Sequence, residues 1–267
     1  MAKKVAPKKK PRKYPALKKK PLVEAILEVR WFLTSPTPET QVDPYYKFIL
    51  GSLYERVKKH YPELERLASS LAPEELVGNT VTHRFRSSAK GWPLIQIGPG
   101  IMTFNDTKKF KWEDFKKRSI EAVNYLYKSH PKPEELKIST LSLRYIDAVE
   151  FDYQKRSIFD FLKEKMNVQM ELPDSLFRDK TTDNIPTGFR WESSYKCKDP
   201  KGSTNLRFYL GKKDGKPGLI WEIMVASPAE NIGNLPSDFP KWIDKANRVS
   251  HDWFFTLIEG DLIKEFS

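Results

Sequence analysis

The chain has 267 residues, of which 39% are hydrophobic and 31% are charged. This balance is typical of a globular protein, and no apolar run approaches the roughly 20 residues that a membrane-spanning helix needs. The formal charge of +12 excludes an acidic protein, and the single cysteine, Cys197, excludes an internal disulfide. A chain without disulfides suits a reducing compartment, so a cytoplasmic protein is expected.

The basic charge is concentrated at the start of the chain. The first twenty residues contain no Asp or Glu and ten basic residues: Lys3, Lys4, Lys8, Lys9, Lys10, Arg12, Lys13, Lys18, Lys19 and Lys20. Removing these ten from the 47 basic residues leaves 37 against 35 acidic ones, so the formal charge falls from +12 to +2. Because prolines interrupt the segment and few apolar residues are present, residues 1–20 are predicted to form a disordered cationic arm.

Such an arm favours nucleic acid, DNA or RNA, as the partner, because basic residues release counterions when they contact the phosphate backbone. Three other interpretations stay open: a tail that aids solubility, attraction to anionic lipid without the apolar signal that anchoring needs, and a nuclear-import signal in a eukaryotic host. No membrane partner is expected. A secretory signal is not expected either, because Glu24, Glu28 and Arg30 interrupt the apolar stretch after the arm.

After the arm, strand and helix patterns follow one another in two similar halves, residues 21–136 and 137–267. In the first half, a strand with alternating apolar residues over 23–31 precedes a helix that is expected to begin at Asp43 as its N-cap. Short strands are predicted near 81–88, 93–97 and 101–104, and a second helix is predicted from Trp112.

The second half repeats this order of elements. A strand over 141–151, whose alternation is broken at Asp147, precedes a helix predicted from Ser157 and an irregular loop over 168–187. Strands are predicted near 188–196, 205–210 and 219–225, the last two joined by a turn over 211–218, and a helix over 242–257. The pattern Lys-Trp-x-Asp at 111–114 recurs at 241–244, either by duplication or by chance between two amphipathic helices.

We therefore predict an α+β protein in which internally duplicated β-α-β-β-β-α units form one or two antiparallel sheets with helices on one face. The two halves are expected to make one pseudo-symmetric globular unit.

Three segments carry a family resemblance. They are the opening strand PLVEAILEVRW at 21–31, the central LRYID strand at 143–147, and a Phe-rich C-terminal helix over 253–266. Over residues 21–267 the chain resembles a family of sporadically distributed, functionally uncharacterised bacterial proteins of about this length. The resemblance implies no activity or catalytic residue, although patchy occurrence is typical of horizontally moved genes such as those of phage defence.

Arginine alternates with aromatic residues on several strands. Because neighbouring side chains of a strand point to opposite faces, these arginines are expected to share one face of the sheet. Guanidinium groups bind phosphate well, so Arg86, Arg144, Arg190 and Arg207 join the arm as candidate nucleic-acid contacts. The alternative is that they form cross-strand pairs with Glu on a solvated sheet.

Signals for catalysis are weak. No His or Cys spacing fits a metal site, no phosphate loop or nucleophile elbow is present, and no cofactor is expected. The carboxylates Glu24, Glu28, Asp147 and Glu150 could gather Mg²⁺, but their Arg neighbours favour charge pairing.

The leading hypothesis is a non-catalytic, nucleic-acid-associated accessory protein of a bacterial defence or mobile-element system. The alternatives are an interaction subunit that does not touch nucleic acid, and a metal-dependent nuclease or other phosphate-processing enzyme.

Overall fold

The computed structural model describes residues 14–37, 40–107, 109–179 and 181–267. Nine of the strands in these ranges form one antiparallel sheet in the order β4-β5-β6-β7-β1-β8-β11-β10-β9. The strands are β1 (Leu22–Trp31), β4 (Glu63–Arg66), β5 (His83–Arg86), β6 (Leu94–Gly98), β7 (Ile101–Asp106), β8 (Ile138–Glu150), β9 (Arg190–Lys198), β10 (Lys201–Lys213) and β11 (Lys216–Pro228). The predicted α+β class with an antiparallel sheet is confirmed.

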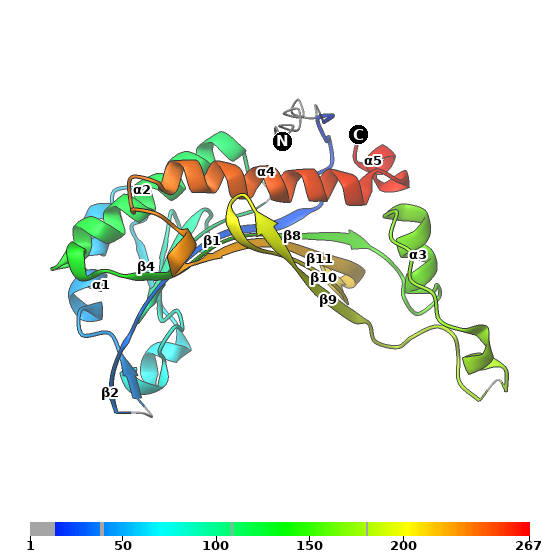
Figure 1. Cartoon of the computed structure of the whole chain (residues 1–267), viewed down its shortest axis with the longest axis horizontal. Coiled ribbons are helices and arrows are strands. Elements are labelled where there is room, and N and C mark those ends of the chain that lie inside the picture. Colours follow the sequence, from blue (N-terminus) through cyan, green and yellow to red (C-terminus); the bar gives the residue numbers. More distant parts are fainter. Residues whose placement is uncertain (1–13, 38–39, 108, 180) are drawn as a thin grey trace, which may run out of the picture.

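The two halves of the chain meet at the pair β1 and β8, which run antiparallel from Leu22 opposite Asp147 to Trp31 opposite Ile138. On one side of this pair the sheet continues through β7, β6 and β5, and on the other side through β11, β10 and β9. The strand order β1-β7-β6-β5 of the first half therefore equals the order β8-β11-β10-β9 of the second. One continuous sheet results, and it bends into an arch (Figure 1).

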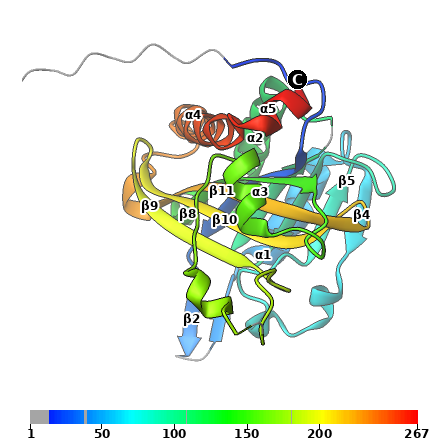
Figure 2. The same ribbon diagram turned by 90° about the vertical axis from the view of Figure 1, so that its right-hand side faces the viewer.

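Five α-helices of the described ranges pack on one face of this sheet. They are α1 (Tyr46–Val57), α2 (Trp112–Ser129), α3 (Ile158–Lys165), α4 (Phe239–Ile258) and α5 (Asp261–Phe266). One apolar core joins β1, β6 and β7 to α1, α2 and the start of α4. A second core joins β10 and β11 to α3, α5 and the end of α4. Helix α4 thus spans both cores, and Figures 1 and 2 show it lying along the sheet.

Local sequence explains some element ends and not others. Helix α3 begins as predicted, because the Ser157 hydroxyl accepts a hydrogen bond from the Phe159 amide at 3.2 Å. Helix α1 begins at Tyr46, not at Asp43. The expected cap is wrong because the buried Asp43 carboxylate is held by the Trp31 indole and by the Gly100 amide.

Several strands differ in length from the prediction. The turn predicted over 211–218 shrinks to Asp214 and Gly215, which both have positive φ, so β10 and β11 extend to Lys213 and from Lys216. The hairpin of β2 (Thr34–Thr37) and β3 (Thr40–Val42) and the edge strand β4 were not predicted. These are short segments of three or four residues in which alternation gives little signal.

The end of the predicted arm packs against the body. The Tyr14 ring stacks on Phe255 at a centroid distance of 4.4 Å, and its hydroxyl donates to Asp252 at 3.0 Å. The Lys19 amide donates to the Phe266 carbonyl at 3.0 Å, which ties this segment to α5. The prediction of disorder is therefore wrong for residues 14–20, because Tyr14 and Leu17 provide apolar contacts. The rest of the predicted arm, residues 1–13, lies outside the described residues.

Candidate functional site

The predicted arginines lie on the sheet face that the helices leave uncovered. On β5, Phe85 is fully buried in the core, so its neighbours Arg84 and Arg86 point to the opposite face. Phe208 on β10 is buried in the same way and directs Arg207 to that face. We call this surface the open face of the sheet.

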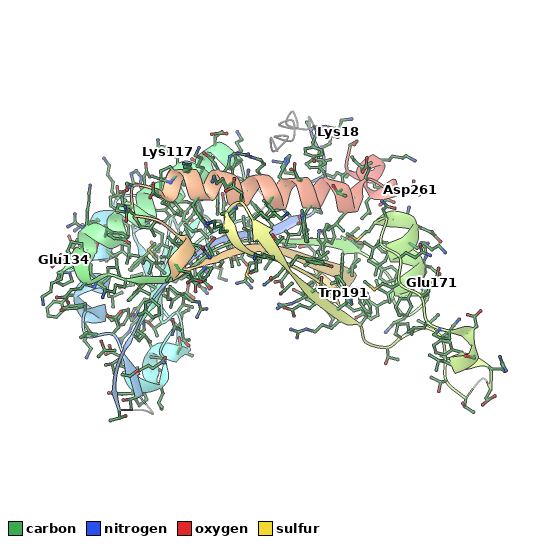
Figure 3. The ribbon with its side chains drawn as sticks, viewed as in Figure 1. Lys18, Lys117, Glu134, Glu171, Trp191 and Asp261 are labelled. Atoms are coloured by element: carbon green, nitrogen blue, oxygen red, sulfur yellow. The ribbon has the colours of Figure 1, made fainter. Side chains whose placement is uncertain are left out.

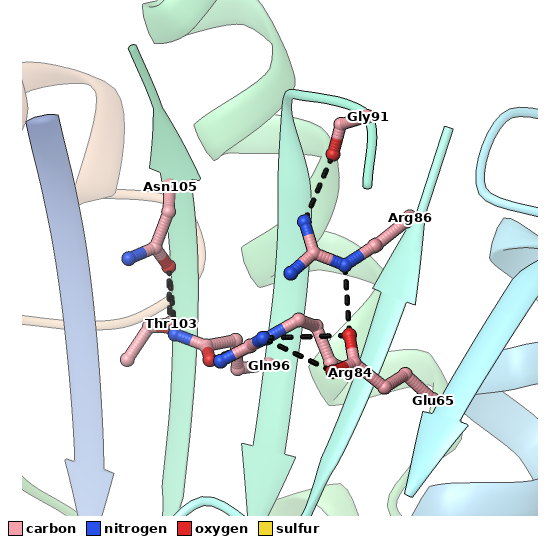
Figure 4. A network of polar contacts seen from close by, with 7 residues as sticks. All are labelled: Glu65, Arg84, Arg86, Gly91, Gln96, Thr103 and Asn105. Atoms are coloured by element: carbon pink, nitrogen blue, oxygen red, sulfur yellow. Dashed lines mark hydrogen bonds and ion pairs between the residues drawn. The ribbon is translucent and has the colours of Figure 1, made fainter. Parts of the chain in front are cut away.

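Glu65 on β4 pairs with two arginines of the neighbouring strand. Its carboxylate accepts from Arg86 Nε at 2.8 Å and from Arg84 Nη1 at 3.3 Å (Figure 4). Arg84 also donates to Gln96 at 2.9 Å, and Arg86 to the Gly91 carbonyl at 3.1 Å. The two guanidinium groups hold the pKa of the Glu65 carboxyl below its usual value, mainly through the hydrogen bond from Arg86.

Two glutamates pair with the arginines of the second half. Arg207 donates from Nε and Nη2 to the two carboxylate oxygens of Glu192, both at 3.0 Å. Glu222 on β11 lies between Arg207 and Arg144, at 3.5 and 3.7 Å from the nearest guanidinium nitrogens. Arg190 lies 3.6 Å from Glu192. This arrangement is that of cross-strand ion pairs.

The structure therefore favours the pairing alternative for the open face. Each of the four predicted arginines has a carboxylate within salt-bridge distance: Arg86 with Glu65, Arg144 with Glu222, and Arg190 and Arg207 with Glu192. Their charge is largely compensated. Only Arg190 is extensively solvent-exposed among these four, at 68% of its side chain.

A different set of basic residues gathers where the arm joins the body. A groove of about 720 Å³ is lined by Lys18 and Lys20 of the arm, by Lys109 and Lys111 of the β7–α2 loop, and by Lys212 and Lys213 at the end of β10. We call it the lysine groove. The Lys20 ammonium donates to the Phe110 carbonyl at 3.0 Å and so holds the arm against the loop. Lys18 lies on the same side of the sheet as α4 (Figure 3).

The lysine groove is strongly cationic. Asp214 is the one acidic residue among its described lining residues. Within the described part of the chain, Lys18, Lys109, Lys111 and Lys212 have no carboxylate within salt-bridge distance. Three segments that are distant in sequence contribute these charges, so the composition of the chain could not predict that they lie together. The Lys212-Lys213 pair was visible in the sequence, but it was assigned only to a hairpin turn, whereas the structure places both lysines at the end of β10.

A second hollow of about 760 Å³ at the β9–β10 turn also contains lysines, namely Lys196, Lys198 and Lys201. Cys197, which also lines this hollow, is only 7% exposed and belongs to the apolar core. The arm does not contribute to the described lining of this hollow. The lysine groove therefore has more basic residues than this hollow, and two of them, Lys18 and Lys20, belong to the basic arm.

The carboxylates considered for Mg²⁺ are not brought together. Glu24 and Glu28 lie on the open face, where Glu24 accepts from Asn105 at 2.7 Å and Glu28 from Arg30 at 2.7 Å. Asp147 lies on the opposite, helix-covered face. Glu150 pairs with Lys216 at 3.0 Å. Among the described residues, no three His, Cys, Asp or Glu side chains group as metal ligands, so this candidate site is not formed.

The comparisons with known proteins assign no family. No family model and no curated protein matches the chain. Among solved structures, the di-domain ARO/CYC StfQ from the steffimycin biosynthetic pathway aligns over 91% of this chain and 97% of its own, at 8% identity and a TM-score of 0.18. A likeness this weak assigns neither a shared fold nor a function. No helix in the described ranges is long and apolar enough to cross a bilayer.

Proposed function

We propose that the protein is a non-catalytic nucleic-acid-associated accessory protein that holds the phosphate backbone in the lysine groove and with its basic arm. The observation that carries this proposal is the convergence of six lysines from three segments on one groove at the root of the arm. A cationic groove that continues into a polybasic segment offers a continuous path for a polyanion.

The pairing of the open-face arginines supports the choice of this groove. An arginine that already donates to a carboxylate must break that contact before it binds phosphate, whereas unpaired lysines need only release solvent and counterions. Lysines act on phosphate as point charges, and contacts to the phosphate backbone carry no sequence information. We therefore expect binding that depends on salt and shows little sequence preference.

The test compares two triple variants that remove the same charge. One replaces Lys109, Lys111 and Lys212 of the groove with Gln, and the control replaces the exposed Lys59, Lys128 and Lys241, which lie elsewhere, with Gln. Binding to fluorescent single- and double-stranded DNA and RNA is measured by anisotropy over a range of salt concentrations. We expect the groove variant to bind at least about tenfold more weakly and to lower the salt slope by about 2 to 3, since each lost phosphate contact contributes roughly 0.7 to 0.9.

Equal losses in the two triple variants would mean that only net charge matters and would remove the groove from the proposal. No binding of the wild-type chain to any of the four nucleic acids would overturn the function itself. Circular dichroism and thermal melting of each variant confirm that the fold is retained.

A second candidate function is that of a protein-interaction subunit. It is favoured by large apolar side chains that the fold leaves exposed in the segment after β4. Leu71 is 84% exposed and Leu76 is 77% exposed, and they lie in two successive 3₁₀ turns, residues 68–71 and 74–76. Replacing both with Ser should abolish capture of a partner from the native host without changing nucleic-acid binding. Unchanged capture would remove this surface as the contact.

The remaining parts of the proposal concern origin and setting. The equal strand order of the two halves and the repeated Lys-Trp-x-Asp segment support an internal duplication. We place the protein in the cytoplasm of a bacterium, in a defence or mobile-element system, on the basis of the single cysteine and the family resemblance over residues 21–267.

A further inference from the structure

A further pocket lies on the helix-covered side of the sheet, between β8, α4 and the segment 14–22. Its volume is about 680 Å³, which is sufficient for a small organic ligand. Aromatic side chains form part of the walls, among them Phe110, Trp112, Tyr145, Phe254 and Phe255, beside several polar residues. We call it the aromatic pocket. The proposed nucleic-acid function makes no use of it.

Two buried polar side chains in this pocket lack hydrogen-bond partners. Asp147 on β8 is 3% exposed and its carboxyl forms no hydrogen bond or ion pair with the described residues, although the charge of Lys213 acts on it. Ser250 on α4 is 1% exposed, and its hydroxyl also has no partner within the described chain. Native proteins seldom leave buried polar groups unsatisfied, because each one costs about 1 to 3 kcal/mol. Both groups line the same pocket, so a ligand that binds there can satisfy both.

The other polar groups of the pocket are already engaged or exposed. Asp244 pairs with Lys116 at 2.8 Å, and Asp252 accepts from Tyr14. The Asn247 carbonyl accepts from the Tyr145 hydroxyl at 2.8 Å. Lys20 and Arg248 also line the pocket, but both are exposed to solvent. The unsatisfied buried group with the greatest capacity to accept hydrogen bonds is therefore the Asp147 carboxylate.

The chemistry of these groups selects a cation. A carboxylate in an apolar site is stabilised by an opposite charge that donates hydrogen bonds to it. An ammonium group carries three N–H donors and no acceptor, so it can serve both Asp147 and the Ser250 hydroxyl. Aromatic faces around the site attract a cation further and accommodate an apolar body. An anionic ligand would instead supply no counter-charge to an ionised Asp147 carboxylate.

We propose that the aromatic pocket binds a small organic cation, an amine or amidine on an aromatic or aliphatic body, with Asp147 as its counter-ion and Ser250 as a second acceptor. The cation and its counter-ion neutralise each other inside the pocket, and the body of the ligand packs against the aromatic side chains. The aromatic pocket adjoins the lysine groove, since Lys20, Pro21, Leu22 and Phe110 line both, but Asp147 and Ser250 line the aromatic pocket and not the groove.

The test uses two probes of nearly equal shape that differ in charge. Tryptamine carries an ammonium group, and tryptophol carries a hydroxyl on the same indole body. Isothermal titration calorimetry on the full-length protein at neutral pH measures both. We expect tryptamine to bind at least about tenfold more tightly than tryptophol, a difference of about 1.4 kcal/mol in binding free energy. This comparison uses the wild-type chain and does not depend on whether a variant folds.

Variants then locate the site. Asp147→Asn should reduce tryptamine affinity at least about tenfold and remove the preference over tryptophol, because the amide supplies no counter-charge. Asp160→Asn on the exposed side of α3 removes the same charge and should leave both affinities unchanged. Equal binding of the two probes, undiminished tryptamine binding by Asp147→Asn, or no tryptamine binding at millimolar concentration would each overturn the proposal.

Discussion

Trp31 and Asp43 form a buried hydrogen bond in which the indole Nε1 donates to the carboxylate Oδ2 at 2.8 Å. Trp31 is 3% exposed and Asp43 is 4% exposed. The same carboxylate oxygen accepts from the Gly100 amide at 3.2 Å, and Oδ1 accepts from the Tyr45 amide at 3.0 Å. One side chain therefore connects β1, the β6–β7 turn and the start of α1.

Replacing this carboxylate should destabilise the fold. Asp43→Ala leaves the Trp31 indole and the Gly100 amide buried without an acceptor, and we expect it to lower the free energy of unfolding by about 2 to 4 kcal/mol. Urea denaturation monitored by circular dichroism measures this change. Asp183→Ala, at an exposed loop position, is the control and should have an effect within about 0.5 kcal/mol of zero. A similar stability of the two variants would show that the buried contacts of Asp43 contribute little.

Asp43 also illustrates what the sequence could predict. Alternation along β1 and β8, helical spacing in α2 and α4, and the Ser157 cap are local patterns, and each predicted an element that the structure contains. The role of Asp43 depends on Trp31 and Gly100, which lie 12 and 57 residues away. No local pattern carries that information, so the nearby helix start was misplaced.

In the candidate sites, too, local sequence patterns predicted some features, whereas others depend on residues that are distant in sequence. Alternation correctly placed Arg86, Arg144 and Arg207 on one face, because the side-chain period of a strand is local. Their pairing with Glu65, Glu192 and Glu222 depends on the register between strands, which the sequence did not specify. The lysine groove and the aromatic pocket each combine segments from both halves of the chain. Their lining could therefore be identified only from the tertiary structure.

The paired arginines of the open face should contribute little to nucleic-acid binding. Arg86→Gln and Arg207→Gln are each expected to change affinity for DNA or RNA by less than about twofold, because their guanidinium groups are already bonded to Glu65 and Glu192. Anisotropy titrations at one fixed salt concentration, beside the groove variant, measure this. A loss as large as that of the groove variant would show that the open face is the binding surface and would overturn the assignment to the groove.

Truncation should separate two roles of the N-terminal segment. Deleting residues 1–13 removes seven basic residues and is expected to weaken nucleic-acid binding without changing thermal stability. Deleting residues 1–20 also removes the stacking of Tyr14 on Phe255 and the bond from Lys19 to Phe266. We expect this longer deletion to lower the free energy of unfolding by a further amount of about 1 to 3 kcal/mol. Equal melting temperatures of the two truncated proteins would contradict a structural role for residues 14–20.

Asp147 should make the stability of the protein depend on pH. Burial raises the pKa of its carboxyl to about 8, although Lys213 acts in the opposite direction. Tyr145 from β8, His251 and Asp252 from α4, and the exposed Lys20 and Arg248 also border the pocket. In the unfolded chain the Asp147 carboxyl titrates near 3.9, so between these two values the folded state binds more protons than the unfolded state. Its contribution to stability is therefore greatest in acid and decreases as pH rises toward 8.

The measurement compares wild type with Asp147→Asn, which cannot titrate at this position. Between about pH 5 and 7.5 the unfolding free energy of wild type should fall relative to the variant by as much as about 1.4 kcal/mol per pH unit. Other titrating groups act equally in both proteins and cancel in the difference. Above pH 8 the variant should be the more stable protein, because it no longer buries a negative charge. Parallel pH profiles would show that Asp147 titrates normally in the folded protein. A bound organic cation should reduce the wild-type slope, because it favours the ionised carboxylate at neutral pH.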